Sequence, residues 1–110
     1  MGAGWAPLPT IPGGFHREDG EAFGVNDEGE IVGSLFTDTD IGPRAVLWVD
    51  GEAVDLNTRI PPADAAQFVL AEAHDINERG QIVGWGLDLP FDVEAYDERA
   101  FLLTPRCVAE

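Results

Sequence analysis

Short stretches that are apolar on both of their alternating sides dominate the hydrophobic pattern of this chain, and turn residues separate them. In residues 31–36, Ile, Gly and Leu occupy one side of an extended strand, while Val, Ser and Phe occupy the other. Residues 44–49 and 82–87 have the same two-sided apolar character. Strands that lack a polar face need cover on both sides. The pattern therefore predicts an all-β fold built from stacked antiparallel sheets.

Turn signals divide the chain into eight expected strands. Long helices are not expected, because 13 Gly and 8 Pro interrupt the 110 residues. The first segment, residues 5–11, carries so much proline that it is expected to be an edge strand or an extended arm. The connector at residues 57–67 is expected to hold one helical turn after Pro61 and Pro62. The other expected strands cover residues 21–25, 30–36, 44–49, 52–56, 68–76, 81–87 and 99–104.

An internal repeat relates the two halves of the chain. Residues 22–33, AFGVNDEGEIVG, return 51 residues later as residues 73–84, AHDINERGQIVG. The segments at 44–47 and 99–102 also match, at a separation of 55 residues. Self-similarity of this kind indicates an array of similar structural units.

The repeat predicts the domain organisation and the architecture. We expect a single domain over residues 1–110, with repeat 1 at about residues 21–56 and repeat 2 at about residues 68–105. The strand at residues 5–11 is expected to complete repeat 2. Two four-stranded antiparallel units of this kind are β-propeller-blade-like. A small two-sheet β-sandwich is the alternative.

Each repeat contains a hairpin turn with the same chemistry. Asn can cap such a turn through its side chain, and Gly can adopt the positive φ of a type I turn followed by a bulge. We predict these structural turns at Asn26 to Gly29 and at Asn77 to Gly80. Three later strand positions lack a side chain and are expected to let a neighbouring sheet approach closely: Gly33, Gly84 and Gly86.

The charge balance narrows the possible partners. The chain carries 21 acidic and 6 basic residues, a formal net charge of −15, whereas a small soluble domain usually carries a net charge of magnitude about 2 to 8. Phosphate backbones and anionic lipid surfaces would repel it, so we expect neither a nucleic acid nor a membrane partner. No stretch approaches the length of a membrane helix. The first residues lack the features of a secretory signal, and the localisation stays open.

One motif occurs twice: Ala-x-x-Val/Ile-Asn-x-x-Gly-x-Ile-Val-Gly, followed by Ala-x-Leu-Trp or Ala-Phe-Leu-Leu-Thr-Pro. Its residues are Val25-Asn26, Gly29, 31–33, 45–48 and Asp55-Leu56 in the first copy, and Ile76-Asn77, 80–84 and 100–105 in the second. The motif resembles the HAF family of probable extracellular repeats, over roughly residues 6–105. The resemblance implies an exported, propeller-like bacterial repeat protein. It implies no biochemical activity and no active site to carry over.

Two acidic loops occupy equivalent places in the repeats and contain the candidate metal ligands. Asp38 and Asp40 lie in the first loop, and Asp88 and Asp92 lie in the second. Oxygen-rich loops suit calcium, but the stretch that begins at Asp38 does not have the spacing of an EF-hand. A solvated acidic surface accounts for both loops. We therefore expect no cofactor, with calcium as the alternative.

No combination of residues in the sequence favours catalysis. The two histidines have no second metal ligand at a suitable spacing, and His74 stands where repeat 1 has Phe23, which favours a packing role. Ser34 is not part of a nucleophile elbow. Trp48 and Trp85 would stack on a glycan if they lined a groove. We therefore predict a non-catalytic β-repeat structural or binding module rather than an enzyme. A calcium- or carbohydrate-binding adhesion module is the alternative.

The order of the strands also predicts an assembly. The first strand, residues 5–11, corresponds to the last strand of a unit, and the chain ends with the first three strands of another. Two units cannot close a ring, and their uncovered faces would be large apolar patches of the kind that marks an interface. We expect a cyclic homo-oligomer with heterologous contacts, a trimer being favoured. A monomeric sandwich is the competing outcome.

Overall fold

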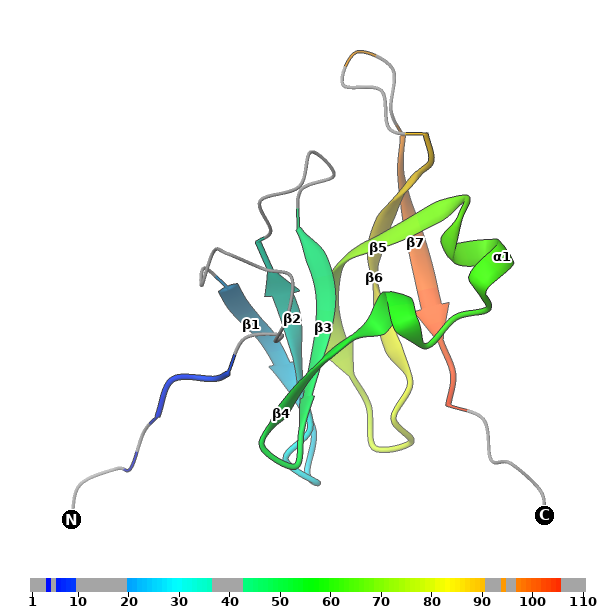
Figure 1. Cartoon of the computed structure of the whole chain (residues 1–110). Helices are drawn as coiled ribbons and strands as arrows, with labels where there is room; N and C mark the ends of the chain where they lie inside the picture. The colour runs from blue at the N-terminus through cyan, green and yellow to red at the C-terminus, as the bar shows by residue number, and fades with distance from the viewer. Residues whose placement is uncertain are drawn as a thin grey trace.

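Two antiparallel β-sheets make up the computed structural model of this chain (Figure 1). The structure describes residues 4, 6–9, 20–36, 43–90, 94 and 97–105. Sheet 1 has the strand order β1-β2-β3-β4, and sheet 2 has the order β5-β6-β7. The strands are β1 (Gly20–Val25), β2 (Ile31–Leu35), β3 (Arg44–Val49), β4 (Glu52–Asp55), β5 (Phe68–Ile76), β6 (Ile82–Asp88) and β7 (Glu98–Leu103). Within the described residues, no helix has the length and apolar character to cross a bilayer.

A short connector joins the two sheets. After β4 come a 3₁₀ turn, η1 (Leu56–Thr58), and one helical turn, α1 (Pro62–Ala65), so the expected helical turn is confirmed. Pro62 suits this place because its ring presets the helical φ, and the first turn has no need of its N–H. The Asn57 side chain ties the connector to β5: it donates to the Leu70 carbonyl at 2.9 Å and accepts from the Leu70 N–H at 2.7 Å.

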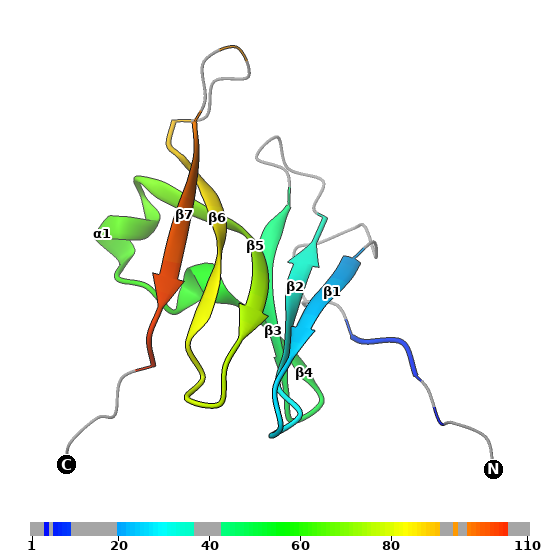
Figure 2. The same ribbon diagram turned by 180° about the vertical axis from the view of Figure 1, so that it is seen from behind.

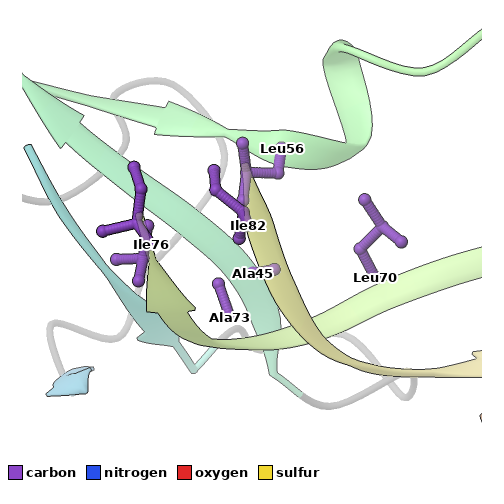
Figure 3. Close-up of a cluster of buried hydrophobic side chains, with 7 residues drawn as sticks. Ala45, Leu56, Leu70, Ala73, Ile76 and Ile82 are labelled. Carbon is purple, nitrogen blue, oxygen red and sulfur yellow. The ribbon is translucent and has the colours of Figure 1, made fainter. Parts of the chain in front are cut away.

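The hydrophobic core lies between one face of sheet 1 and one face of sheet 2 (Figure 3). Strand β5 packs against β1, β2 and β3, and so forms the contact between the sheets. The buried side chains of this core are Val32, Ala45, Leu56, Leu70, Ala73, Ile76 and Ile82. A second cluster, on the other side of sheet 1, contains Leu35, Val46 and Trp48. Sheet 1 is therefore covered on both faces, as its two-sided apolar strands require.

The all-β class is confirmed, and the expected strands from residue 21 onward lie within one residue of their predicted ends. The expectation of two four-stranded units is met in sheet 1 only, because sheet 2 has three strands among the described residues. Of the expected strand at residues 5–11, the described residues 6–9 belong to neither sheet. Pro7 and Pro9 have no N–H to offer a strand ladder. The part of the chain that is described closes neither a propeller ring nor a barrel.

Both repeat turns have the predicted geometry. Gly29 and Gly80 each have φ of 79°. The Asn26 side-chain oxygen accepts hydrogen bonds from the N–H groups of the residues two and four positions later, at 3.1 and 3.0 Å. Asn77 does the same in the second turn, at 3.0 and 2.9 Å. The capping role of Asn and the positive φ of Gly are therefore confirmed in both repeats.

The strand glycines serve a different purpose from the one expected. A Cβ at Gly33 would overlap the backbone oxygen of Glu21, and a Cβ at Gly84 would overlap that of Glu72. Both overlaps lie at β-bulges, where the pairing register of β1 and of β5 shifts. Gly86 is likewise closed off by backbone of β5. The close approach is between strands of one sheet, so the expectation of a closely approaching second sheet at these positions is wrong.

Replacing Gly29 tests the turn geometry. Gly29→Val is expected to lower the free energy of unfolding by about 1–2 kcal/mol, because an L residue is strained in the left-handed region. No atom lies within 4 Å of a Cβ built at this position, so steric overlap with the rest of the protein does not contribute. Gly29→Asn should recover most of the loss, since Asn tolerates positive φ. Urea denaturation measures all three proteins, and a Val variant as stable as the parent would contradict the assigned turn.

Candidate binding face

Equivalent residues of the two repeats lie directly against each other. The Phe23 ring stacks on the His74 imidazole, with centroids 4.6 Å apart and an interplanar angle of 16°. A Cβ built at Gly24 would lie 3.0 Å from the Cα of Asp75. Both pairs are 51 positions apart, which is the offset of the repeat. Strands β1 and β5 therefore stack in register, and the packing role expected for His74 is confirmed.

Hydrogen bonds join the two repeat turns, which lie at the same end of the molecule (Figure 2). Asn26 Nδ2 donates to the Asn77 carbonyl at 3.1 Å. The Asp27 N–H donates to both carboxylate oxygens of Glu78, at 3.0 and 3.1 Å. Asn26 is only 7% exposed, whereas Asn77 is exposed. The turn of repeat 1 is thus covered by the turn of repeat 2.

The sheets meet through opposite faces of the repeat. Sheet 1 presents Val32 and Leu47, which are cross-strand neighbours, to the core. Sheet 2 presents Ile82 to the same core. The repeat 1 equivalent of Ile82 is Ile31, which lies on the side of sheet 1 away from sheet 2. We call that side the back face of sheet 1, with Ala22, Val25, Ile31, Leu35, Val46 and Trp48. The contact between the repeats is therefore head to tail.

One face of sheet 2 has no sheet against it within the described residues. Its side chains alternate with the core residues along the strands, and we call it the open face: Asp75, Val83, Trp85 and Leu102. Val83 and Leu102 are cross-strand neighbours and are 45% and 60% exposed. A shallow hollow on this face is lined by Asp75, Ile76, Asn77, Gln81, Val83 and Leu102. Beside the Asn77 turn the open face is an exposed apolar surface, whereas Val69 and Leu87, farther along the same face, are buried.

The corresponding face of repeat 1 is buried. Val32 is the equivalent of Val83, and it is 0% exposed. Leu47 is the equivalent of Leu102, and it packs against the core. Sheet 2 covers both residues. The repeat thus presents the same apolar surface twice, once covered and once open, and the open copy is the candidate binding face.

The two tryptophans considered as glycan platforms have different surroundings. Trp48 lies on the back face, is 5% exposed, and donates from Nε1 to the Pro9 carbonyl at 2.7 Å. Trp85 lies half-buried on the open face. Its Nε1 donates to Glu72 Oε1 at 3.1 Å, and the same oxygen lies 2.8 Å from His74 Nε2. The structure does not bring the two indoles together, and only Trp85 keeps an appreciable exposed surface.

Asp88 is the one predicted metal ligand within the described residues, since Asp38, Asp40 and Asp92 lie outside them. Asp88 Oδ2 accepts a hydrogen bond from Arg99 Nε at 2.6 Å. This hydrogen bond, with the attraction between the two charges, raises the pKa of the Arg99 guanidinium. No group of three or more His, Cys, Asp or Glu side chains in the described ranges could hold a metal ion. Calcium binding stays a prediction.

An uncovered apolar face was expected from the sequence, but the residues of the open face were not identified, although one signal of them was present. Position 24 is glycine in repeat 1, where another sheet covers it, and the equivalent position in repeat 2 is Asp75. A charged side chain at the equivalent of a covered glycine indicates that this side of the second repeat faces water.

No family model, curated protein or solved structure matches this chain. The resemblance to the HAF repeats therefore stays a prediction that rests on the repeated residues.

The two turn asparagines form a matched pair for a stability test. Each accepts the same two backbone hydrogen bonds in its own turn, but Asn26 alone also donates to the other repeat. Asn26→Ala is expected to lower the free energy of unfolding by about 1 kcal/mol more than Asn77→Ala, the contribution of one additional hydrogen bond. Urea denaturation of both variants measures the difference. Equal losses would mean that the bond between the turns does not stabilise the stack.

Proposed function

We propose that this chain is a non-catalytic β-repeat module that binds another protein surface through the open face of sheet 2. The observation that supports the proposal is the exposure of Val83 and Leu102, whose equivalents Val32 and Leu47 are covered by a sheet. An uncovered apolar patch usually marks an interaction surface. In repeat 1 the same surface accepts a sheet, so its shape suits a β-rich partner.

The proposal includes the blade-like, HAF-type nature of the repeats. Sheets that stack head to tail with β1 and β5 in register leave the open face of sheet 2 without a second sheet at one end of the stack. At the other end, the back face of sheet 1 has residues 7–9 beside Leu35 and Trp48 instead of a sheet. Such a stack can be extended by further units, as in propellers and other repeat proteins. A simple sandwich, by contrast, uses its two apolar faces on each other.

The proposal assigns no reaction to the chain. The Asp55 carboxylate accepts from Arg44 Nε at 2.7 Å, and the Asp88 carboxylate accepts from Arg99 Nε at 2.6 Å. Both ion pairs join neighbouring strands of one sheet, so these charges have a structural role. In repeat 1 the arginine pairs with the fourth strand, and in repeat 2 it pairs with β6 instead.

A carbohydrate-binding module is the second candidate, and Trp85 is the residue that favours it. Its half-buried indole lies on the open face beside Val83. Aromatic rings with one accessible side can pack on the apolar faces of sugars. In this alternative the same face binds a glycan instead of a protein.

A paired substitution tests whether the open face is free for binding. Val83→Ser with Leu102→Ser is expected to change the free energy of unfolding by no more than about 1 kcal/mol, because both side chains are largely exposed. The double variant should also bind less of a fluorescent dye that reports apolar surface, in dilute solution. The matched control, Val32→Ser with Leu47→Ser, should cost several kcal/mol because it places hydroxyls in the core. Urea denaturation and dye titration provide the two measurements.

Two results would count against the proposal. Unchanged dye binding in the Val83 and Leu102 double variant would mean that the open face is not the exposed apolar surface. Glycan-array binding that survives this double variant but is lost in Trp85→Ala would favour the carbohydrate module, and its dependence on calcium would be read in the same experiment.

A further inference from the structure

We propose that the partner of the open face is a second copy of this chain, which docks the back face of its sheet 1 there in head-to-tail fashion. This inference rests on the proposed function, because it names the occupant of the same face. The contact between repeats 1 and 2 inside one chain is the template for the contact between two chains.

The exposed apolar residues on the open face and the back face are the repeat equivalents of residues that are buried between repeats 1 and 2. Inside the chain, Ile76 of sheet 2 lies in one buried cluster with Val32 of sheet 1. The repeat equivalent of Ile76 is Val25, on the back face, and that of Val32 is Val83, on the open face. Val25 and Val83 are 62% and 45% exposed. Val32 and Ile76 thus pack together inside the chain, whereas their equivalents Val83 and Val25 are exposed and lack this packing partner.

Few large apolar side chains are exposed elsewhere. Five large hydrophobic residues are exposed in the described part of the chain, and three of them, Val25, Val83 and Leu102, are equivalents of residues in the contact between the repeats. Scattered single hydrophobic residues on a surface need no explanation. The location of these three residues on the open face and on the exposed part of the back face is explained by a further copy at each face.

The polar groups of the repeat turns fit the same arrangement. Within the chain, Asn26 Nδ2 donates to the carbonyl of Asn77. Asn77 Nδ2 donates one hydrogen bond to Gln81 at 2.8 Å, and an amide group has two N–H bonds. When a second copy docks in the same way, the second N–H of Asn77 in the first copy would face the carbonyl of Asn26 in the docked copy. The exposed backbone N–H of Glu78 in the first copy would face the Asp27 carboxylate of the docked copy. The internal equivalent is the hydrogen bond from the Asp27 N–H to the Glu78 carboxylate.

A second copy also brings a segment for the free edge of sheet 2. Leu8 lines a hollow with Leu35 and Trp48 on the back face. The sequence LPTIP that begins at Leu8 is similar to LNTRIP, which begins at Leu56, and Leu56 packs against sheet 2 in the core. Strand β4 leads into Leu56 and lies beside β3. By the same geometry, Ala6 and Pro7, which lead into Leu8, would lie beside β7 when a copy docks.

One residue makes this contact weaker than its template. Within the chain the backbone at Gly24 lies so close to repeat 2 that a Cβ there would be 3.0 Å from the Asp75 Cα. On the open face the equivalent of Gly24 is Asp75 itself, so its carboxylate would meet the backbone of the docked copy. The net charge of −15 per chain adds repulsion between copies. The association is therefore reversible and strengthened by salt, which shortens the Debye length from about 10 Å at 0.1 M to about 3 Å at 1 M.

The decisive experiment mixes two variants that each lack one face. Val25→Asp disables the back face, and Leu102→Asp disables the open face; both residues are largely exposed, so both variants are expected to fold. At about 1 M salt, where charge repulsion is screened, the parent should run above the mass of one chain by light scattering, with a closed ring of three copies proposed. Each variant alone should run as one chain. Their equimolar mixture should form a complex of two chains, because one intact back face meets one intact open face.

Control variants separate docking from charge and from misfolding. Ala63→Asp adds the same charge on the exposed helical turn α1 and should assemble like the parent. Asp75→Gly removes the obstructing side chain and should lower the apparent Kd about tenfold, whereas Asp75→Asn keeps the bulk and should gain less. Circular dichroism and urea denaturation establish that each variant is folded.

Three results would overturn the inference: a parent that stays a single chain at both salt concentrations, a Val25→Asp variant that assembles like the parent, or a mixture that stays at the mass of one chain. The second of these would indicate an open-face to open-face dimer. Any of the three, together with reduced dye binding in the Val83 and Leu102 serine variant, would leave the proposed function standing with another partner. Unchanged dye binding in that variant would overturn both.

Discussion

The packing of β5 across sheet 1 is the contact on which the rest of the structure depends. Apolar burial stabilises it, at about 1.5–3 kcal/mol for each large side chain such as Val32 or Ile76. Burial alone has no direction, so the alignment comes from groups with fixed geometry: the stacked rings of Phe23 and His74, and the bond from Asn26 to Asn77. A slip of one residue along β5 would turn its core side chains to the opposite face. Apolar contacts supply most of the stability, and the paired equivalents determine the register.

Much of the fold could be predicted from the sequence, because local chemistry determines it. Asn and Gly at the repeat turns, and the Asp50-Gly51 turn with φ of 53° and 79°, specify hairpins wherever they occur between apolar strands. The sequence left an edge strand and an extended arm open for residues 5–11; in the described residues 6–9, the Pro9 carbonyl accepts a hydrogen bond from Trp48 and takes no part in a strand ladder. The bulges in β1 and β5 were missed. A bulge depends on the pairing between two strands, and the alternation of residues in one strand does not reveal it.

The candidate site was harder to predict, because its residues look the same as those of the core. The Ile-Val-Gly at 31–33 and that at 82–84 are identical in sequence, yet the first valine is buried and the second is exposed. What distinguishes them is whether a sheet lies above, and that is a property of the tertiary arrangement. The two tryptophans illustrate the same difficulty for sequence-based prediction. Both lie in apolar strands, but only Trp85 lies on the open face, and Trp48 is buried.

The bond between Asn57 and Leu70 has a consequence for the order in which the protein folds. It joins residues 13 positions apart, whereas the contacts between the repeat turns span 51. The entropy of loop closure makes the shorter loop more favourable by about 1 kcal/mol. The amide of Asn57 also resembles a strand neighbour, since it donates to and accepts from one backbone residue. The connector can thus orient β5 before the two repeat turns come into contact. The repeats therefore dock first next to the connector, and the contact between their turns forms afterwards.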